Sequence, residues 1–247
     1  MREFAAIAES YLARRQHHPS LLLWCGGNEL LGALDGGKMG MDLPLDASHP
    51  MLAAAGEVVR RLDPTRRYLP ASPSGPRTWV TPETRGQGLH HDVHGPWNHP
   101  GALESWFEFW DQDDALFHSE VGMPGAGPAG LLRRYGGDLA LPGDAANPWW
   151  NHTNGWWIQW PDYLEAGGDP AHLDAYVAWS QARQAQALAY AAAACKRRFP
   201  ACGGFILWMG HDCYPCPVNT AILDFAGQPK PAALALGEVF RSRPGPA

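Results

Sequence analysis

Hydrophobic positions along this chain alternate between short strand-like runs and longer segments with helical spacing. The run at Leu21 is continuously apolar, which is typical of a strand buried on both faces. Five short runs in all predict strands, and they begin near Leu21, Tyr68, Leu89, Leu116 and Phe205. Between them lie segments whose spacing predicts helices over residues 2–16, 48–61, 103–110, 169–198 and 232–240, with Asp169 as the cap of the longest. This alternation predicts an α/β fold with a parallel sheet.

The first run, Leu21-Leu-Leu-Trp-Cys-Gly-Gly-Asn-Glu29, ends on an amide and a carboxylate. The glycine pair lets the backbone turn sharply where the strand ends, so Asn28 and Glu29 are expected at its carboxyl tip. In parallel α/β barrels the chemistry takes place at this end of the strands. A strand followed by an ordinary charged loop is the alternative interpretation of this run.

A later apolar run also leads to a carboxylate beside a glycine. The segment Ala115-Leu-Phe-His-Ser-Glu-Val-Gly122 joins a short apolar strand to one carboxylate, Glu120, with a glycine just after it. Two carboxylates presented from two strand ends suit the cleavage of a glycosidic bond, one as proton donor and the other as nucleophile or base. The sequence therefore predicts Glu29 and Glu120 as a catalytic pair.

Together the two runs resemble the glycoside hydrolases of family 2, most closely their β-mannosidase branch. In that family the fourth barrel strand ends in Trp-Cys-Gly-x-Asn-Glu with the acid/base, and the seventh ends in Ser-Glu-x-Gly with the nucleophile. The matching residues here are Asn28-Glu29 and Ser119-Glu120. Gly27 stands where the family more often has Asn, a departure that leaves the acid/base assignment intact.

The resemblance covers residues 17–240 in register. The segments Asp63–Pro73, Asp92–His94 and Phe205–Trp208 look like the family's fifth, sixth and eighth strands. The resemblance implies a partial (β/α)8 TIM barrel, made of strands four to eight and their helices without the first three strands, as a single domain over residues 1–247. Gly95 stands where the family's sixth-strand motif tends to carry an aromatic residue, and this departure bears on sugar recognition.

The resemblance also implies the activity. A retaining β-glycosidase hydrolyses terminal β-linked sugars by double displacement, and β-mannosides are the expected substrates, with galactose, glucuronic acid and glucosamine as the other sugars of the family. Glu29 is the expected acid/base and Glu120 the ionised nucleophile, with carboxyl groups about 5–5.5 Å apart. Neither a cofactor nor a metal is expected. The alternative is a truncated, non-catalytic remnant that at most binds carbohydrate.

Four further residues are expected to bind the substrate. Asn28 is expected to hydrogen-bond the sugar's 2-hydroxyl, although an amide at a strand end also caps turns. Trp208 is expected to form the floor of the sugar subsite, with a plain core tryptophan as the alternative. His94 and Trp97 are expected to line the pocket, although a histidine in such a loop is often structural only.

Charge and hydropathy restrict the partners. A net charge of −6 with no basic run longer than the three residues Lys196-Arg-Arg198 argues against nucleic acid. No apolar window approaches the length of a membrane span, and the opening residues lack the signature of a signal peptide. Missing barrel strands would expose the edges of the first and last apolar runs. The expected partners are therefore a carbohydrate substrate and either a second copy or a complementing N-terminal segment.

Cysteine and tryptophan usage adds two observations. The five cysteines are an odd number, which suits a reduced protein. Cys213-Tyr-Pro-Cys216 has metal-ligand spacing, but a second close pair is missing, so a structural zinc is the less favoured interpretation. The twelve tryptophans include a cluster between Trp149 and Trp160, within a long predicted loop over residues 123–168. This cluster is expected either to stack on sugar rings or to cover apolar surface.

Overall fold

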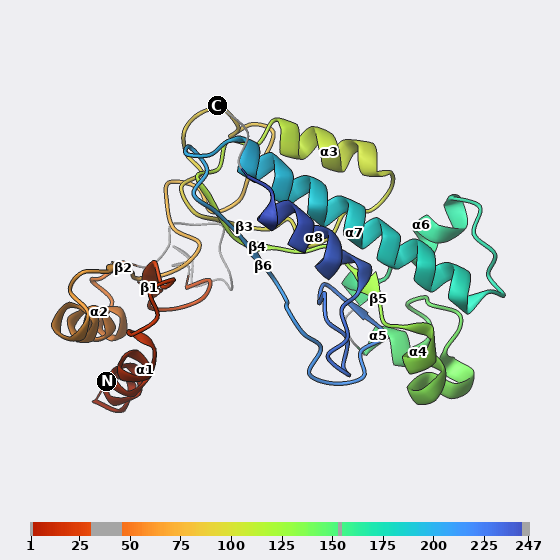
Figure 1. The fold of residues 1–247 in the computed structure, drawn as a ribbon, viewed down its shortest axis with the longest axis horizontal. Coiled ribbons are helices and arrows are strands. Elements are labelled where there is room, and N and C mark those ends of the chain that lie inside the picture. Colours follow the sequence, from red (N-terminus) through yellow and green to blue (C-terminus); the bar gives the residue numbers. More distant parts are fainter. Residues whose placement is uncertain (1, 31–45, 153–154, 244–247) are drawn as a thin grey trace. The chain divides into compact units, whose positions relative to one another are not determined.

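The computed structural model describes residues 2–30, 46–152 and 155–243, and these residues group into two compact units (Figure 1). Unit 1 takes the chain up to His94 together with Asp114–Ser119. Unit 2 takes Gly95–Asp113 and the chain from Glu120 onward. Each unit has its own apolar core. The expected single domain over residues 1–247 stays a prediction.

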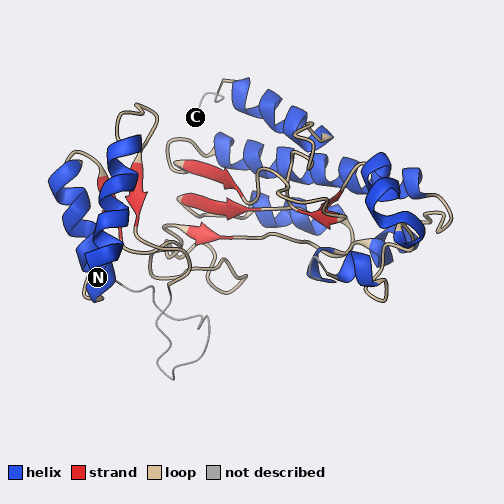
Figure 2. Cartoon of the chain, turned by 90° about the horizontal axis from the view of Figure 1, so that it is seen from below, coloured by secondary structure: helices blue, strands red, loops and turns tan. Residues whose placement is uncertain are grey.

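Unit 1 combines two helices with a pair of short strands (Figure 2). The helices are α1 (Arg2–Arg15) and α2 (Pro50–Leu62), and the strands are β1 (Leu23–Cys25) and β2 (Arg67–Leu69), followed by β3 (Val93–His94). β1 and β2 are parallel, with Trp24 opposite Tyr68. The parallel pairing expected from the sequence is confirmed for these two strands.

The core of unit 1 fastens β1 to α2. Leu12, Trp24, Val58 and Val59 form its buried cluster. Trp24 Nε1 donates a hydrogen bond to Asp63 Oδ2 at 2.8 Å, where α2 ends. This bond, together with the ion pair to Arg66, holds the pKa of the Asp63 carboxyl below its usual range. The strand that leads to Glu29 is therefore anchored by both packing and a buried hydrogen bond.

Unit 2 holds the remaining elements. Its helices are α3 (Leu103–Asp111), α4 (Ala129–Gly136), α5 (Pro148–Asn151), α6 (Trp160–Glu165), α7 (Leu173–Arg197) and α8 (Pro231–Arg241), with 3-10 turns η1 (Gly137–Leu139) and η2 (Gly155–Trp157). Its strands are β5 (Gly125–Ala126), β6 (Gly204–Leu207) and β7 (Val218–Asn219). β4 (Phe117–Val121) begins in unit 1 and ends in unit 2. β5 and β7 pair antiparallel, and both are too short to show a pattern in the sequence.

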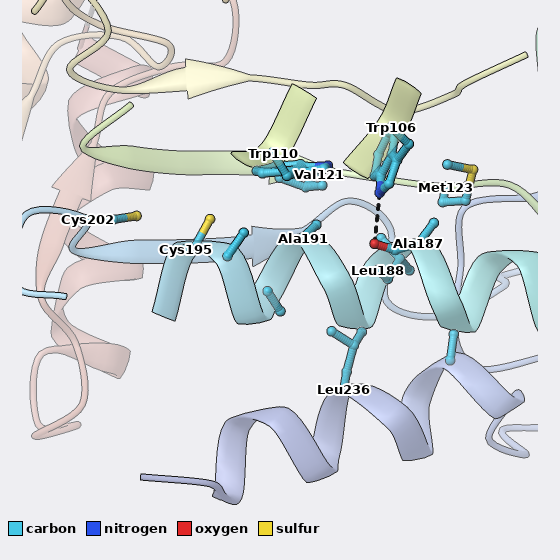
Figure 3. Close-up of a cluster of buried hydrophobic side chains, with 13 residues drawn as sticks. Trp106, Trp110, Val121, Met123, Ala187, Leu188, Ala191, Cys195, Cys202 and Leu236 are labelled. Carbon is cyan, nitrogen blue, oxygen red and sulfur yellow. Dashed lines mark hydrogen bonds between the residues drawn. The ribbon is translucent and has the colours of Figure 1, made fainter. Parts of the chain in front are cut away.

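The helix α7 forms the centre of unit 2, and half of the residues that it buries are small. Ala187 and Ala191 are fully buried, and their size lets α3 and α8 approach closely. Trp106 and Trp110 of α3 pack on one side of α7, and Leu236 of α8 packs on the other (Figure 3). Trp106 Nε1 donates to the Ala187 carbonyl at 2.9 Å, so one of the largest core side chains is also hydrogen-bonded.

The prediction of Asp169 as the cap of the long helix is wrong, because α7 begins at Leu173. Asp169 Oδ1 accepts a hydrogen bond from the Ala171 N–H at 2.8 Å, which closes a local turn before the helix. Short polar side chains often bond their own backbone in this way and so compete with capping. In the parts of the chain that the structure describes, no helix is long and apolar enough to cross a membrane.

The stretch of residues 123–168 is not the loop that the sequence predicts. Its described residues include β5, α4, η1, α5, η2 and α6, arranged around a second apolar cluster. Trp150, Trp157 and Trp160 are buried there, so these three tryptophans cover apolar surface. The helices have four to eight residues, too few for helical spacing to be recognised in the sequence.

The strands predicted near Leu89 and Leu116 are present, but their bounds differ from the predicted ones. The run near Leu89 becomes a strand only at Val93–His94, and β4 extends past Ser119, so Glu120 lies within the strand rather than after it. The structure is α/β, with small sheets in place of the single parallel sheet that was expected. Loops with hydrogen bonds of their own separate the short strands.

Lys230 and Asp212 form an ion pair in the interior of unit 2. Lys230 Nζ lies 3.9 Å from Asp212 Oδ2, and both side chains are 1% exposed. Lys230 Nζ also donates to the Gly125 carbonyl at 3.0 Å, and Asn219 Nδ2 donates to Asp212 Oδ1 at 2.6 Å. Because burial removes water from both charged forms, it raises the pKa of Asp212 and lowers that of Lys230.

Replacing Lys230 with Met is expected to lower the free energy of unfolding by about 3–5 kcal/mol, because Asp212 would keep a buried charge without its cation. The double variant Lys230→Met with Asp212→Asn should recover a large part of that loss, since no charge is then buried. Urea unfolding of the three proteins measures the difference. Equal losses in the single and double variants would contradict a coupled pair.

Candidate active site

Glu29 stands out in unit 1 because few side chains tolerate its backbone conformation. Its φ is 49°, and among the residues that the structure describes it is the only non-glycine with a positive φ. The Glu29 N–H donates to the Ser72 carbonyl at 2.6 Å, and the Ser72 N–H donates to the Gly27 carbonyl at 3.0 Å. These bonds continue the pairing of β1 and β2 past both strands. Strained residues held in this way concentrate at functional sites.

The side chain of Glu29 meets a buried histidine. Its Oε1 lies 3.0 Å from His94 Nδ1, with the Glu29 side chain 16% exposed and the His94 side chain 1% exposed. On the other side of the ring, Nε2 lies 3.1 Å from Ser72 Oγ, and the Trp79 ring stands edge-on to the imidazole. An imidazole can donate or accept at either nitrogen, so this carboxyl–imidazole pair is able to hold a proton.

Serine hydroxyls surround a buried carboxylate behind His94. Asp92 is 5% exposed, and its Oδ2 accepts hydrogen bonds from Ser72 Oγ at 2.9 Å and from Ser74 Oγ at 3.3 Å. Its Oδ1 accepts from Ser119 Oγ. A buried carboxylate needs such donors to offset the loss of water. Asp92 is therefore the fixed acceptor around which the hydroxyls orient.

In unit 2 the carboxylate of Glu120 has a donor as its neighbour. Trp97 Nε1 donates to Glu120 Oε2 at 3.0 Å, and the Glu120 main-chain carbonyl accepts from the Gly95 N–H at 2.7 Å. The loop that carries Trp97 is therefore fastened to β4. An indole N–H only donates, and its bond is stronger to an ionised acceptor. This environment suits a carboxylate that stays charged, which is the form a nucleophile needs.

Four tryptophan rings lie in contact beside Glu120, and we call them the tryptophan wall. The ring centre of Trp97 lies 6.4 Å from that of Trp208 and 5.9 Å from that of Trp156, and Trp157 lies 5.4 Å from Trp208. Trp156 is 52% exposed whereas Trp157 is buried. The wall therefore has an exposed edge and a buried base. Flat rings with polar N–H edges suit a ligand that is apolar on its faces and polar at its rim, as a sugar is.

Two adjacent residues of α7 fix the segments that frame Glu120. Arg183 donates to the His99 carbonyl at 2.8 Å, in the loop that carries Trp97. Gln184 Nε2 donates to the Met123 carbonyl at 2.9 Å, just past the end of β4. Buried main-chain carbonyls need donors, and α7 supplies them from one turn.

The structure explains why a glycine stands at position 122, the last residue of the Ser-Glu-x-Gly segment. A Cβ atom on Gly122 would lie 2.8 Å from both the Trp208 carbonyl oxygen and Thr220 Cγ2, which is closer than real Cβ contacts allow. The Trp208 N–H also donates to the Val121 carbonyl at 2.9 Å. The absence of a side chain at Gly122 therefore lets Trp208 lie against the end of β4.

The structure distributes the six predicted site residues between the units. Unit 1 holds Asn28, Glu29 and His94, and unit 2 holds Trp97, Glu120 and Trp208. Asn28 is exposed, and its backbone pairs with Ser72. The buried ring of His94 contacts Glu29, and its expected place in the lining of the pocket stays a prediction. In unit 2, Trp97 and Trp208 are neighbours in the tryptophan wall.

Sequence reasoning did not single out the polar residues behind His94, which are Ser72, Asp92 and Ser119. Asp92 precedes His94 by two positions, and alternate residues of an extended segment share a face, so this spacing was an available signal. Ser119 belongs to the Ser-Glu-x-Gly segment, but nothing in the sequence around either serine indicates a contact with Asp92. Their hydroxyls reach Asp92 only because separate segments of unit 1 fold together.

The Cys213–Cys216 segment lacks the features of a zinc site. Cys213 is exposed and Cys216 is buried, and Cys216 Sγ donates to the Val218 carbonyl at 3.3 Å. Burial raises the pKa of the Cys216 thiol to about 11, which disfavours the thiolate that binds metal. Within the described ranges neither cysteine belongs to a group of three or more side chains able to hold a metal ion.

Two sequence relatives match nearly all of the chain. It is 26% identical to β-mannosidase B of Emericella nidulans, across 95% of this chain and 29% of that protein. It is 26% identical to β-mannosidase B of Aspergillus clavatus, across 92% of this chain and 28% of that protein. The chain thus spans less than a third of the length of these relatives. No family model matches it.

Two solved structures share its fold. A β-D-mannosidase from Dictyoglomus thermophilum matches with a TM-score of 0.68 at 22% identity, over 96% of this chain and 28% of that one. An exo-chitosanase from Amycolatopsis orientalis matches with a TM-score of 0.63 at 16% identity, over 96% of this chain and 27% of that one. At these identities the likeness concerns the fold.

The substitution Gly122→Ala is expected to lower the free energy of unfolding by about 1–3 kcal/mol, because the new methyl overlaps the Trp208 carbonyl and Thr220. Gly130→Ala is the matched control, since Gly130 is an exposed residue of α4 with nothing near its would-be Cβ. That change should stabilise by up to about 1 kcal/mol. Thermal unfolding compares the two, and equal melting temperatures would contradict the close approach at Gly122.

Proposed function

This chain belongs to the β-mannosidase-like branch of the family 2 glycoside hydrolases, and we propose that it acts as a retaining β-glycosidase on terminal β-linked sugars, with β-mannosides as the leading substrates. The curated relatives it matches are β-mannosidases. Because the chain spans 29% of the first of them, its activity and substrate are proposals. Glucosamine-containing substrates are the second sugar class, supported by the fold shared with an exo-chitosanase.

The observation that carries this proposal is the contrast between the partners of the two carboxylates. Glu29 faces an imidazole nitrogen at 3.0 Å, which can share a proton with it. Glu120 faces an indole N–H at 3.0 Å, which can only donate. Retaining glycosidases need one protonated and one ionised carboxyl group. We assign Glu29 as the acid/base and Glu120 as the nucleophile.

The proposed reaction has two steps. In the first, the Glu29 proton moves to the glycosidic oxygen while a Glu120 oxygen attacks the anomeric carbon, so the alcohol leaves and a glycosyl ester forms. In the second, Glu29 takes a proton from water, and the water oxygen attacks the anomeric carbon. Glu120 is released as a carboxylate, and the sugar leaves with its configuration retained.

The remaining predicted residues take supporting roles in the proposal. Asn28, next to Glu29, would bond the sugar's 2-hydroxyl, and Trp97 and Trp208 would hold the sugar's apolar face on the tryptophan wall. We also propose that β1, β2, β3, β4 and β6 correspond to the fourth to eighth strands of a (β/α)8 barrel. Their order along the chain and the shared fold support this correspondence.

A carbohydrate-binding role without turnover is the second candidate function. It is favoured by the fact that the chain spans only 28–29% of the length of its curated relatives. Self-association, or pairing with a complementing N-terminal segment, stays part of the proposal. Hydrolysis of an aryl β-mannoside separates the two candidates, because a binding protein would retain the sugar and release no phenol.

Replacing Glu120 with Ala is expected to abolish hydrolysis of an aryl β-mannoside, because no glycosyl ester can form. Added azide should restore turnover and give the mannosyl azide of inverted configuration, since azide occupies the space of the lost carboxylate. Proton NMR of the product reads the configuration. Full activity in this variant would contradict the role of Glu120.

Replacing Glu29 with Ala should slow substrates with poor leaving groups by about 10²–10⁴-fold, the range that general acid catalysis contributes. Substrates with good leaving groups should form the glycosyl ester at a nearly normal rate. Azide should then give a product of retained configuration. If the two variants exchange these behaviours, the assignment of acid and nucleophile is reversed.

The separation of the carboxyl groups is a further prediction. In a retaining enzyme they should lie about 5–5.5 Å apart, whereas about 6.5–9.5 Å would favour inversion. A crystal structure with a bound mannose-configured inhibitor would measure the distance. A gap of about 10 Å or more would contradict a shared role in one reaction.

A further inference from the structure

The polar cluster behind His94 decides which imidazole nitrogen carries the proton. Ser72 Oγ lies 2.9 Å from Asp92 Oδ2, 2.9 Å from Ser119 Oγ and 3.1 Å from His94 Nε2. A hydroxyl has one proton, so Ser72 can donate to only one of these three neighbours. The direction of that single proton sets the role of Nε2.

The buried carboxylate is the strongest of the three acceptors. Asp92 is 5% exposed, and a carboxylate accepts from hydroxyls with shorter and stronger bonds than a neutral ring nitrogen does. Ser119 already donates to Oδ1. Whether Ser72 donates to Asp92 or to Ser119, its oxygen is then left to accept from His94. In both arrangements Nε2 must carry a hydrogen.

In the neutral imidazole, a hydrogen on Nε2 determines what Glu29 meets at Nδ1. The neutral ring then presents the lone pair of Nδ1 to Glu29 Oε1 at 3.0 Å, a contact that needs a proton between the two atoms. The opposite tautomer, with its hydrogen on Nδ1, would donate to Glu29 and favour the ionised carboxylate. An acid catalyst must start from the protonated form.

We propose that Asp92 and Ser72 are positioning residues that hold His94 in its Nε2–H tautomer and so keep the catalytic proton at Glu29. The inference rests on the proposed role of Glu29 as the acid/base. Neither residue touches the substrate in this scheme, and both act through the histidine. The arrangement is analogous to the aspartate of a Ser-His-Asp triad, which fixes the tautomer of its histidine.

The same arrangement serves both reaction steps. In the first step the Glu29 O–H bond breaks and the proton passes to the glycosidic oxygen. The Glu29 carboxylate then faces the Nδ1 lone pair with no proton between the two atoms. In the second step an O–H bond of water breaks and that proton returns to Glu29, which restores the bond to His94.

Nitrogen NMR of the whole chain labelled with 15N-histidine tests the tautomer without requiring turnover. The His94 signals are identified by their loss in His94→Gln. The expected result for the unsubstituted protein at neutral pH is a neutral ring with its hydrogen on Nε2 and none on Nδ1. A neutral ring with its hydrogen on Nδ1, or a ring protonated at both nitrogens, would overturn the proposal, whatever the variants do.

Two variants test the cause of that tautomer. In Asp92→Asn the amide donates to Ser72, so the Ser72 proton should turn to Nε2 and the ring should change to Nδ1–H. Ser72→Ala removes the link and should give a mixture of both forms. Ser74→Ala is the control, because Ser74 bonds Asp92 at 3.3 Å but has no bond to His94 in the hydrogen-bond network described above. An unchanged tautomer in folded Asp92→Asn and Ser72→Ala would overturn the proposal.

Kinetics distinguish positioning from a structural role. Asp92→Asn should slow an alkyl β-mannoside by up to about 10²–10⁴-fold, the limit set by general acid catalysis, and leave a dinitrophenyl β-mannoside nearly unchanged. An equal loss on both substrates would overturn the positioning role. If the unsubstituted chain hydrolyses neither, the proposed function fails while the NMR result still decides the tautomer.

Discussion

Unit 2 depends on one helix that both packs closely and supplies hydrogen bonds. Small residues on the buried face of α7 let α3 and α8 approach, and longer polar side chains of the same helix reach the loops. Arg183 and Gln184 satisfy carbonyls of the segments on either side of Glu120, and Lys196 donates to the Val239 carbonyl where α8 ends. Because buried carbonyls must be paired, this single helix fixes the position of the loops around the carboxylate.

The two glutamates are proposed to play different chemical roles, and the difference comes from their hydrogen-bond partners. Glu29 sits on a strained backbone with an imidazole as its partner, and Glu120 sits within a strand with an indole N–H as its partner. An imidazole can accept a proton from a carboxyl group, whereas an indole cannot. The difference in character therefore comes from the partners and not from the glutamates.

The partners described for each carboxylate belong to its own unit. Glu29, His94, Ser72 and Asp92 lie in unit 1, and Glu120, Trp97 and the rest of the tryptophan wall lie in unit 2. This matters for a chain that spans less than a third of its curated relatives, since the chemistry proposed for each carboxylate is argued from residues within these 247.

Local patterns in the sequence were sufficient for much of the fold. The helices α1, α2, α3 and α8 end within two residues of the predicted bounds, because apolar spacing and flanking proline or charge act over one or two turns. Local patterns failed for α7, whose expected cap bonds its own turn, and for the short helices of residues 123–168. In both cases the deciding contacts are formed by the fold around them.

The sequence by itself also singled out the two carboxylates as candidates, since a short apolar run followed by a glutamate with glycine nearby is a local feature. Only the tertiary structure decided what each one meets. His94 lies 65 residues from Glu29 along the chain, and Trp97 lies 23 residues from Glu120. No periodicity links positions so far apart. Their contacts arise because packing brings separate segments together, and a hydrogen bond at 3.0 Å then fixes the chemistry of each group.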